Sequence, residues 1–211
     1  RVPWISYNWG PFGVGANALL APGDPSQGWV YTPEGIRASI AYARSLGREV
    51  AGMVITSPDN PTGLTLSIRR QADLARTALE SGAAFVLLDW MYHYITDGQP
   101  NDLNAFYSYF EPEERERLII MDGLTKSLGA SNIRNAHLIA SSQVTRFIVA
   151  LASHGVIPSF YSQAVAIAAY EIGFAEASKT IVGPTNGSRR VVADFLAEKN
   201  IRHILGKGYY A

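Results

Sequence analysis

Three short apolar runs, each followed by polar residues, constrain the fold of this chain more than any other feature of its sequence. They span residues 51–56, 84–88 and 118–121. Each has the length of a strand and is apolar almost throughout, as expected of strands that are buried on both faces. Helical stretches lie between them, and this alternation predicts an α/β fold. We expect a doubly wound, mostly parallel sheet with helices on both faces.

The segments around these runs carry local signals of their own. Ser67 can cap a helix over residues 68–80, and Thr32-Pro33 opens an earlier helix. The first 31 residues are rich in aromatic residues, glycine and proline, so we expect an ordered loop there instead of a helix. The later patterns predict a strand at 136–140, helices at 143–152, 158–177 and 188–199, and strands at 201–205 and 208–211.

Composition excludes several classes of protein. Lysine plus arginine equals aspartate plus glutamate at 18 each, so no net charge attracts nucleic acid or an anionic membrane. The chain has no cysteine, no apolar run of membrane-spanning length and no signal-peptide pattern, which is compatible with a cytoplasmic protein. A zinc site and a serine hydrolase are both poorly supported, because there is no G-x-S-x-G motif and the four histidines lack ligand spacing: His93, His137, His154 and His203.

A polar side chain that could bind a ligand or take part in a reaction follows each of the three apolar runs. Asn60 follows the first, Asp89 and Tyr92 follow the second, and Lys126 follows the third with Arg134 eight residues further on. Ligands of open α/β sheets bind at the carboxyl ends of the strands. A lysine amine that can form a Schiff base, beside a guanidinium that can bind an anion, suits pyridoxal phosphate, an aldehyde that carries a phosphate.

The remaining three side chains also have uses for that cofactor. An aspartate can pair with the ring nitrogen, while a tyrosine and an asparagine can bond the phenolate oxygen. Singly, each has an ordinary structural reading: residues 60–63 as a plain turn, Asp89 and Tyr92 as a hydrogen-bonded core pair, and Lys126 and Arg134 as surface cations. These separate readings do not explain why all five side chains follow predicted strands in this order.

The run Asn60-Pro61-Thr62-Gly63, the unit Asp89-x-x-Tyr92, and Lys126 with Arg134 resemble the class I and II aminotransferases, which are pyridoxal-phosphate enzymes of fold type I. The resemblance implies that Lys126 holds the cofactor as an internal aldimine and later moves a proton. It implies further that Asp89 pairs with the pyridine nitrogen, that Tyr92 and Asn60 bond the phenolate oxygen, and that Arg134 binds the phosphate. Tyr7 is similar to a position where an aromatic ring stacks on the cofactor.

Some positions depart from the family pattern. Many relatives have a serine phosphate ligand three residues before the lysine, where this chain has Gly123; the hydroxyl of Thr125 is the substitute we expect. Asn132 and Ala136 stand where relatives often have glycine. These departures suggest a divergent subgroup.

The resemblance covers only the middle of a family member. The chain starts Arg-Val-Pro without methionine, and we expect residues 1–178 to be a cofactor-binding large domain truncated at its N-terminus. Residues 179–211 would be a linking helix and the start of a smaller α+β domain. Such a fragment exposes core faces, so further chain or a partner subunit, as in a homodimer, is expected.

The function implied by the resemblance is transfer of an amino group between an L-amino acid and a 2-oxo acid. Two alternatives stay open. Another fold type I enzyme, a lyase, decarboxylase or synthase, shares the first covalent step with the cofactor. A non-catalytic, aminotransferase-like regulatory domain is the other, although no basic or helix-turn-helix segment supports it.

Overall fold

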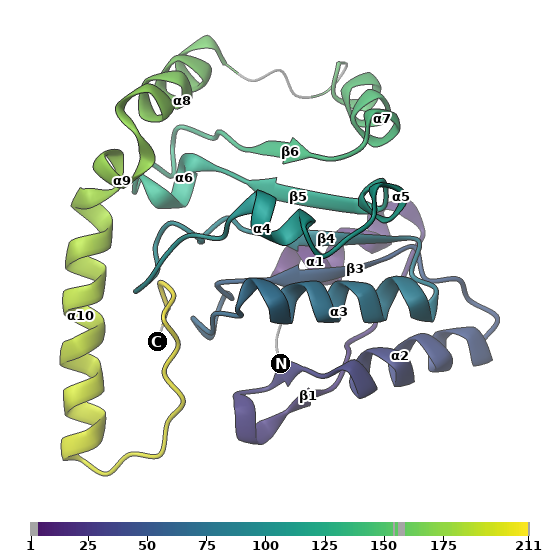
Figure 1. Ribbon diagram of the computed structural model, residues 1–211, viewed down its shortest axis with the longest axis horizontal. Helices are drawn as coiled ribbons and strands as arrows, with labels where there is room; N and C mark the ends of the chain where they lie inside the picture. The colour runs from purple at the N-terminus through teal and green to yellow at the C-terminus, as the bar shows by residue number, and fades with distance from the viewer. Residues whose placement is uncertain (1–3, 154, 156–158, 211) are drawn as a thin grey trace.

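The centre of the protein is a four-stranded sheet with the strand order β3-β4-β5-β6, seen in the computed structural model, which describes residues 4–153, 155 and 159–210 (Figure 1). The strands are β3 (Gly52–Thr56), β4 (Phe85–Asp89), β5 (Leu118–Asp122) and β6 (His137–Ile139). β3, β4 and β5 run parallel, whereas β6 pairs with β5 in the antiparallel direction. The predicted α/β class with a mostly parallel sheet is confirmed, and the sheet is mixed at β6.

Helices precede, connect and follow these strands. The principal helices are α2 (Pro33–Ser45), α3 (Ile68–Ser81), α7 (Ser142–Ala152), α8 (Phe160–Ile172) and α10 (Lys179–Glu198). The short ones are α1 (Ile5–Trp9), α4 (Leu103–Tyr107), α5 (Pro112–Arg115), α6 (Leu124–Ser127) and α9 (Phe174–Ala177). Two 3-10 turns, η1 (Pro11–Val14) and η2 (Pro25–Gln27), and a small hairpin of β1 (Gly23–Asp24) and β2 (Val30–Tyr31) complete the N-terminal part.

The predicted caps account for the ends of the two long N-terminal helices. The hydroxyls of Thr32 and Ser67 accept hydrogen bonds from the backbone N–H of Gly35 and Arg70, which would otherwise lack partners at the first turns. Gly82 ends α3 in the left-handed conformation, at φ 102°. Both helices therefore begin at the residues that the sequence predicted.

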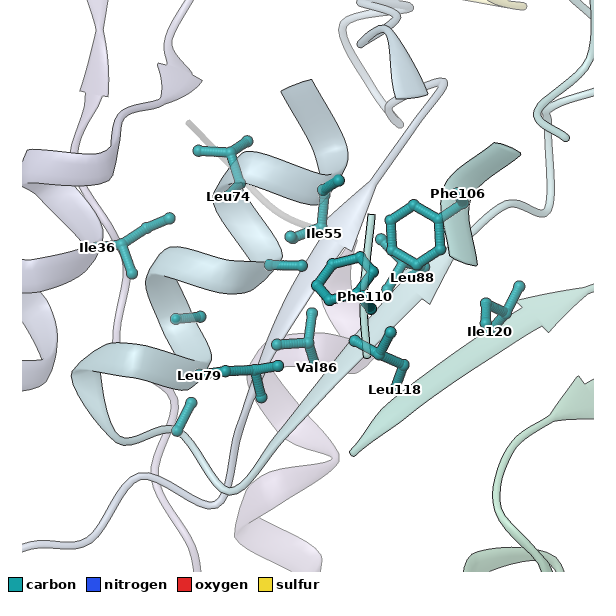
Figure 2. Close-up of a cluster of buried hydrophobic side chains, with 14 of the residues drawn as sticks. Ile36, Ile55, Leu74, Leu79, Val86, Leu88, Phe106, Phe110, Leu118 and Ile120 are labelled. Carbon is teal, nitrogen blue, oxygen red and sulfur yellow. The ribbon is translucent and has the colours of Figure 1, made fainter. Parts of the chain in front are cut away.

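One face of the sheet forms the core. Ile55, Leu88 and Ile120 are paired in register across β3, β4 and β5, and all three are almost fully buried. Figure 2 shows them packed with side chains of α2, α3 and the segment around α4, including Ile36, Leu74, Phe106 and Phe110. Because strand side chains alternate, Thr56, Asp89 and Met121 share the opposite face at the carboxyl ends of the strands.

Three predictions of local structure need correction. The N-terminal segment, expected to be a loop, contains the helix α1, which carries Tyr7. Helix α10 starts nine residues before the expected residue 188, because the fold tolerates Pro184 inside the helix. The expected strands at the chain end are wrong for residues 201–210, which have no strand partner there. Pro158 and Ala211 lie outside the described residues.

The last ten described residues instead form an extended segment without strand pairing. In Figure 1 this yellow segment returns from the end of α10 and runs between that helix and the loops after β3 and β4. Backbone hydrogen bonds tie it to both loops, from Gly208 N–H to the Gly63 carbonyl and from Asp97 N–H to the Lys207 carbonyl. The segment therefore reaches the carboxyl ends of the strands.

Candidate active site

Lys126 is the third of the four residues of the single helical turn α6, which follows β5 after Gly123. Leu124, Thr125 and Ser127 around it are buried, whereas Lys126 is only half-buried. Its Nζ lies 5.8 Å from the centre of the Tyr92 ring, within the range of a cation–π contact. The amine of Lys126, after β5, therefore lies beside the phenol ring of Tyr92, after β4.

Gly123 is required by the close packing before this turn. A Cβ atom at position 123 would lie 2.8 Å from the Asn135 carbonyl oxygen and 2.8 Å from the Met91 methyl group. Thr125 donates its hydroxyl to the same carbonyl at 3.1 Å, so it fastens the lysine turn to the segment before β6. The absence of the family's serine at position 123 thus has a steric reason.

Asp89 ends β4 as a largely buried carboxylate. Its Oδ2 accepts a hydrogen bond of 2.6 Å from the hydroxyl of Tyr7, and its Oδ1 accepts one of 3.0 Å from the backbone N–H of Met91. Burial raises the pKa of Asp89 above its ordinary value, although both hydrogen bonds act to lower it. Burial and the charge of Asp89 likewise raise the pKa of Tyr7.

The structure therefore gives Tyr7 a different contact from the one the sequence suggested. Its hydroxyl binds the carboxylate that is expected to pair with the cofactor's ring nitrogen. Stacking of the Tyr7 ring on a cofactor remains a prediction.

Tyr92 lies in an aromatic cluster with the C-terminal segment. Its hydroxyl is 3.0 Å from the hydroxyl of Tyr210, and its ring is 5.9 Å from the stacked ring of Tyr209. Burial is the largest cause of the raised pKa of Tyr92, followed by Tyr210 and then the charge of Asp89. Tyr92 thus contacts both Lys126 and Tyr210, and the charge of Asp89 acts on its hydroxyl.

Asn60 is half-buried in a loop that is anchored by its neighbour Asp59. The Asp59 carboxylate accepts hydrogen bonds from the hydroxyls of Thr56 at 2.7 Å and Thr62 at 2.6 Å. Asp59 is 2% exposed, so this carboxylate holds the loop that follows β3. Sequence reasoning overlooked it, although the Thr-x-x-Asp-x-x-Thr spacing was a usable signal.

Arg134 lies in the segment between α6 and β6. It is exposed, has the left-handed backbone angle φ 53°, and donates a hydrogen bond of 3.2 Å to the Ser131 carbonyl. It lines a cavity of about 940 Å³ whose lining, among the described residues, does not include Lys126, Asp89 or Tyr92.

That cavity lies over β5 and β6 and contains two of the histidines. Asp122 Oδ2 is 3.2 Å from His93 Nε2 and 3.7 Å from His137 Nε2. Within the described part of the chain, no three potential ligands are arranged to hold a metal ion, and His154 is outside it. The described helices likewise include none with the length and apolar character of a membrane span.

Comparisons with known proteins bear on the family and the fold. The family described as aminotransferase class I and II matches residues 14–210. The chain is 24% identical to an aspartate aminotransferase of Geobacillus stearothermophilus over 168 residues, 79% of this chain and 40% of that protein. It is 31% identical to a probable N-acetyl-LL-diaminopimelate aminotransferase of Bacillus subtilis over 126 residues, 59% of this chain and 30% of that protein.

The fold has counterparts among solved structures. An aromatic aminotransferase of Pyrococcus horikoshii superimposes with a TM-score of 0.82 at 18% identity, covering 98% of this chain and 53% of that one. The chain thus spans about half the length of this structure and 40% of the first curated relative.

Proposed function

Because this chain belongs to the class I and II aminotransferase family, we propose that it forms the cofactor-binding part of a pyridoxal-phosphate-dependent aminotransferase. The observation that carries this proposal is the 5.8 Å contact between the Lys126 amine and the Tyr92 ring, at the carboxyl ends of the strands, where Asp89 ends β4. The reaction would move an amino group from an L-amino acid to a 2-oxo acid.

The residues present fit the chemistry of this cofactor. When bound, pyridoxal phosphate supplies a ring that accepts the electron pair released when a bond to the substrate α-carbon breaks. An ionised carboxylate has about four acceptor positions, and the two hydrogen bonds to Asp89 leave room for a ring N–H. A buried anion with a raised pKa is stabilised by such a partner, so Asp89 would hold a proton on the ring nitrogen.

The other side chains have distinct roles in the proposal. Lys126 would bind the aldehyde carbon and later carry the proton of the substrate α-carbon, which a half-buried amine beside an aromatic ring can do. Tyr92 and Asn60 would donate hydrogen bonds to the phenolate oxygen. Arg134, with one of its five N–H groups bonded to Ser131, would bind the phosphate with its remaining N–H groups. Thr125 would exchange its hydrogen bond to the Asn135 carbonyl for one to a phosphate oxygen.

We also propose the wider arrangement of the complete protein. The sheet face opposite the core carries apolar side chains that are only partly covered, Val54, Leu87 and Ile119, which supports a doubly wound sheet with helices on both faces. The large domain would comprise residues 1–178, and residues 179–211 would lead into a smaller domain. Exposed aromatic side chains on α7 and α8, Phe147 at 65% and Phe160 at 88%, support a homodimer.

The absorption spectrum of the purified protein with pyridoxal phosphate tests the proposal. We expect a visible band that is absent from Lys126→Ala, which lacks the amine, together with a loss of turnover by at least about a thousandfold. Asp89→Ala should keep the band yet lose most turnover. A complete protein without a visible band would refute the proposal.

The same preparation distinguishes the reaction type. An aminotransferase turns over amino acids only when a 2-oxo acid acceptor is present, whereas a lyase or decarboxylase forms product without one. A protein that binds the cofactor but turns over none of the amino acids would have a regulatory function.

A further inference from the structure

Resting on the proposed function, we propose that Tyr210 is a positioning residue, whose hydroxyl donates to Tyr92 and so strengthens the hydrogen bond that Tyr92 gives to the phenolate oxygen of the bound cofactor. The substrate contacts neither hydroxyl in this assignment. Tyr210 acts on the cofactor only through Tyr92.

The direction of the hydrogen bonds follows from the number of protons. The two hydroxyl oxygens are 3.0 Å apart, and either could be the donor in the protein alone. A tyrosine hydroxyl has one proton to donate and can accept in return. When Tyr92 gives its proton to a phenolate oxygen, the proton between the two tyrosines must come from Tyr210.

The rings are held so that this contact persists. Tyr92 is 8% exposed, and the Tyr210 ring meets it edge-on at 5.5 Å. The Tyr209 ring is stacked on Tyr92 at 5.9 Å and lies 5.1 Å from the Tyr210 ring. The three rings therefore form one cluster, in which the Tyr210 hydroxyl is the one bonded to the Tyr92 hydroxyl among the described residues.

Close backbone contacts fix the position of Tyr210. Gly63 has φ 66°, and a Cβ atom there would lie 1.9 Å from the Tyr210 carbonyl oxygen. A Cβ atom at Gly206 would lie 2.1 Å from the Gly63 carbonyl oxygen, and one at Gly208 would lie 2.6 Å from Pro58. These glycines let the chain end cross the Asn60 loop at backbone distance.

Helix α10 also holds the C-terminal segment, through Arg189. The buried guanidinium of Arg189 donates to the Gly208 carbonyl and, at 2.6 Å, to Asn186. Burial lowers the pKa of Arg189, and the charge of Asp97 opposes this shift. Tyr210 is thus positioned by the backbone and by α10, independently of its own hydroxyl.

The expected effect is on the proton affinity of the nitrogen that joins Lys126 to the cofactor. Hydrogen bonds in a chain polarise one another by roughly 10–30%. A stronger bond from Tyr92 draws electron density from the phenolate oxygen, which then holds the neighbouring nitrogen's proton less well. Loss of the Tyr210 hydroxyl should therefore raise the pH at which the visible band changes, by about 0.3, a twofold change in proton affinity.

The test is a pH titration of the visible band in the complete holoenzyme and in Tyr210→Phe, with Tyr209→Phe as the matched control. Tyr210→Phe keeps the ring and loses one hydroxyl, so far-UV circular dichroism should be unchanged. We expect a raised midpoint in Tyr210→Phe, a larger rise in Tyr92→Phe, and no change in Tyr209→Phe.

The outcomes separate this inference from the proposed function. A band whose midpoint is the same in Tyr210→Phe and the parent overturns the role of Tyr210 and leaves the proposed function standing. Equal shifts in Tyr209→Phe and Tyr210→Phe also overturn it, because they would indicate a general packing effect. A parent without any band overturns both.

Discussion

Replacing Tyr7 with phenylalanine should destabilise the protein in a pH-dependent manner. The change removes a 2.6 Å hydrogen bond to the Asp89 carboxylate and leaves the ring in place. That length is typical of a hydroxyl bonded to an ionised oxygen, and bonds to charged groups contribute about 1.5–3 kcal/mol. We therefore expect the free energy of unfolding to fall by about 2 kcal/mol at neutral pH.

The dependence on pH follows from the pKa of Asp89. Burial holds this pKa above its ordinary value, and the Tyr7 hydrogen bond acts in the opposite direction. Without that bond the folded-state pKa of Asp89 rises further, while the unfolded-state pKa stays at about 3.9. Below the unfolded-state pKa the carboxyl group is protonated in both states, so the loss is smallest there; it grows as the pH rises through the folded-state pKa.

Urea unfolding followed by fluorescence at pH 4 and pH 8 measures both effects. With a urea m-value of about 2 kcal/mol/M, a loss of about 2 kcal/mol moves the midpoint by about 1 M at pH 8. Tyr42→Phe is the matched control, because Tyr42 is 56% exposed on α2, and it should change stability by less than about 0.5 kcal/mol. The same loss in Tyr7→Phe at both pH values would refute Asp89 as its anionic acceptor.

Two further predictions concern the loop and the core. Gly63 has a left-handed backbone angle, and a Cβ there would clash with the Tyr210 carbonyl oxygen, so we expect Gly63→Ala to displace the C-terminal segment. Limited proteolysis should then cut this segment faster than in Gly47→Ala, where φ is also positive but the space is open. Phe106→Ala empties the space beside Trp90 and Phe110, and should lower the free energy of unfolding by about 3–5 kcal/mol in the same urea assay, whereas Tyr109→Ala at the surface should cost far less.

The sequence predicted where the candidate site residues that follow strands lie in the fold. Asp89 ends β4 and Lys126 lies in the turn α6 that follows β5, so the apolar runs place both at the carboxyl ends of the strands. An unpaired carboxylate after five apolar residues is costly, so the sequence indicates that Asp89 needs a partner. That partner, Tyr7, could not be identified, because it comes from a short helix in a segment with no periodic pattern.

The chain end was mispredicted for a related reason. Residues 201–205 have the composition of a strand, but a strand needs a neighbour, and none lies beside them in the described structure. Gly206 and Gly208 instead fit the segment against the Asn60 loop. Such long-range backbone contacts leave no trace in local patterns, so Tyr210 was missed as well.

The wide separation of contacting residues also affects how the site comes into being. Tyr7 meets Asp89 across 82 residues, and Tyr92 meets Tyr210 across 118. Contacts of this kind form late and slowly, since long stretches of backbone must be ordered before they are made. During synthesis on the ribosome, the Tyr92–Tyr210 hydrogen bond cannot form until residue 210 has emerged, long after β4 and β5 are complete.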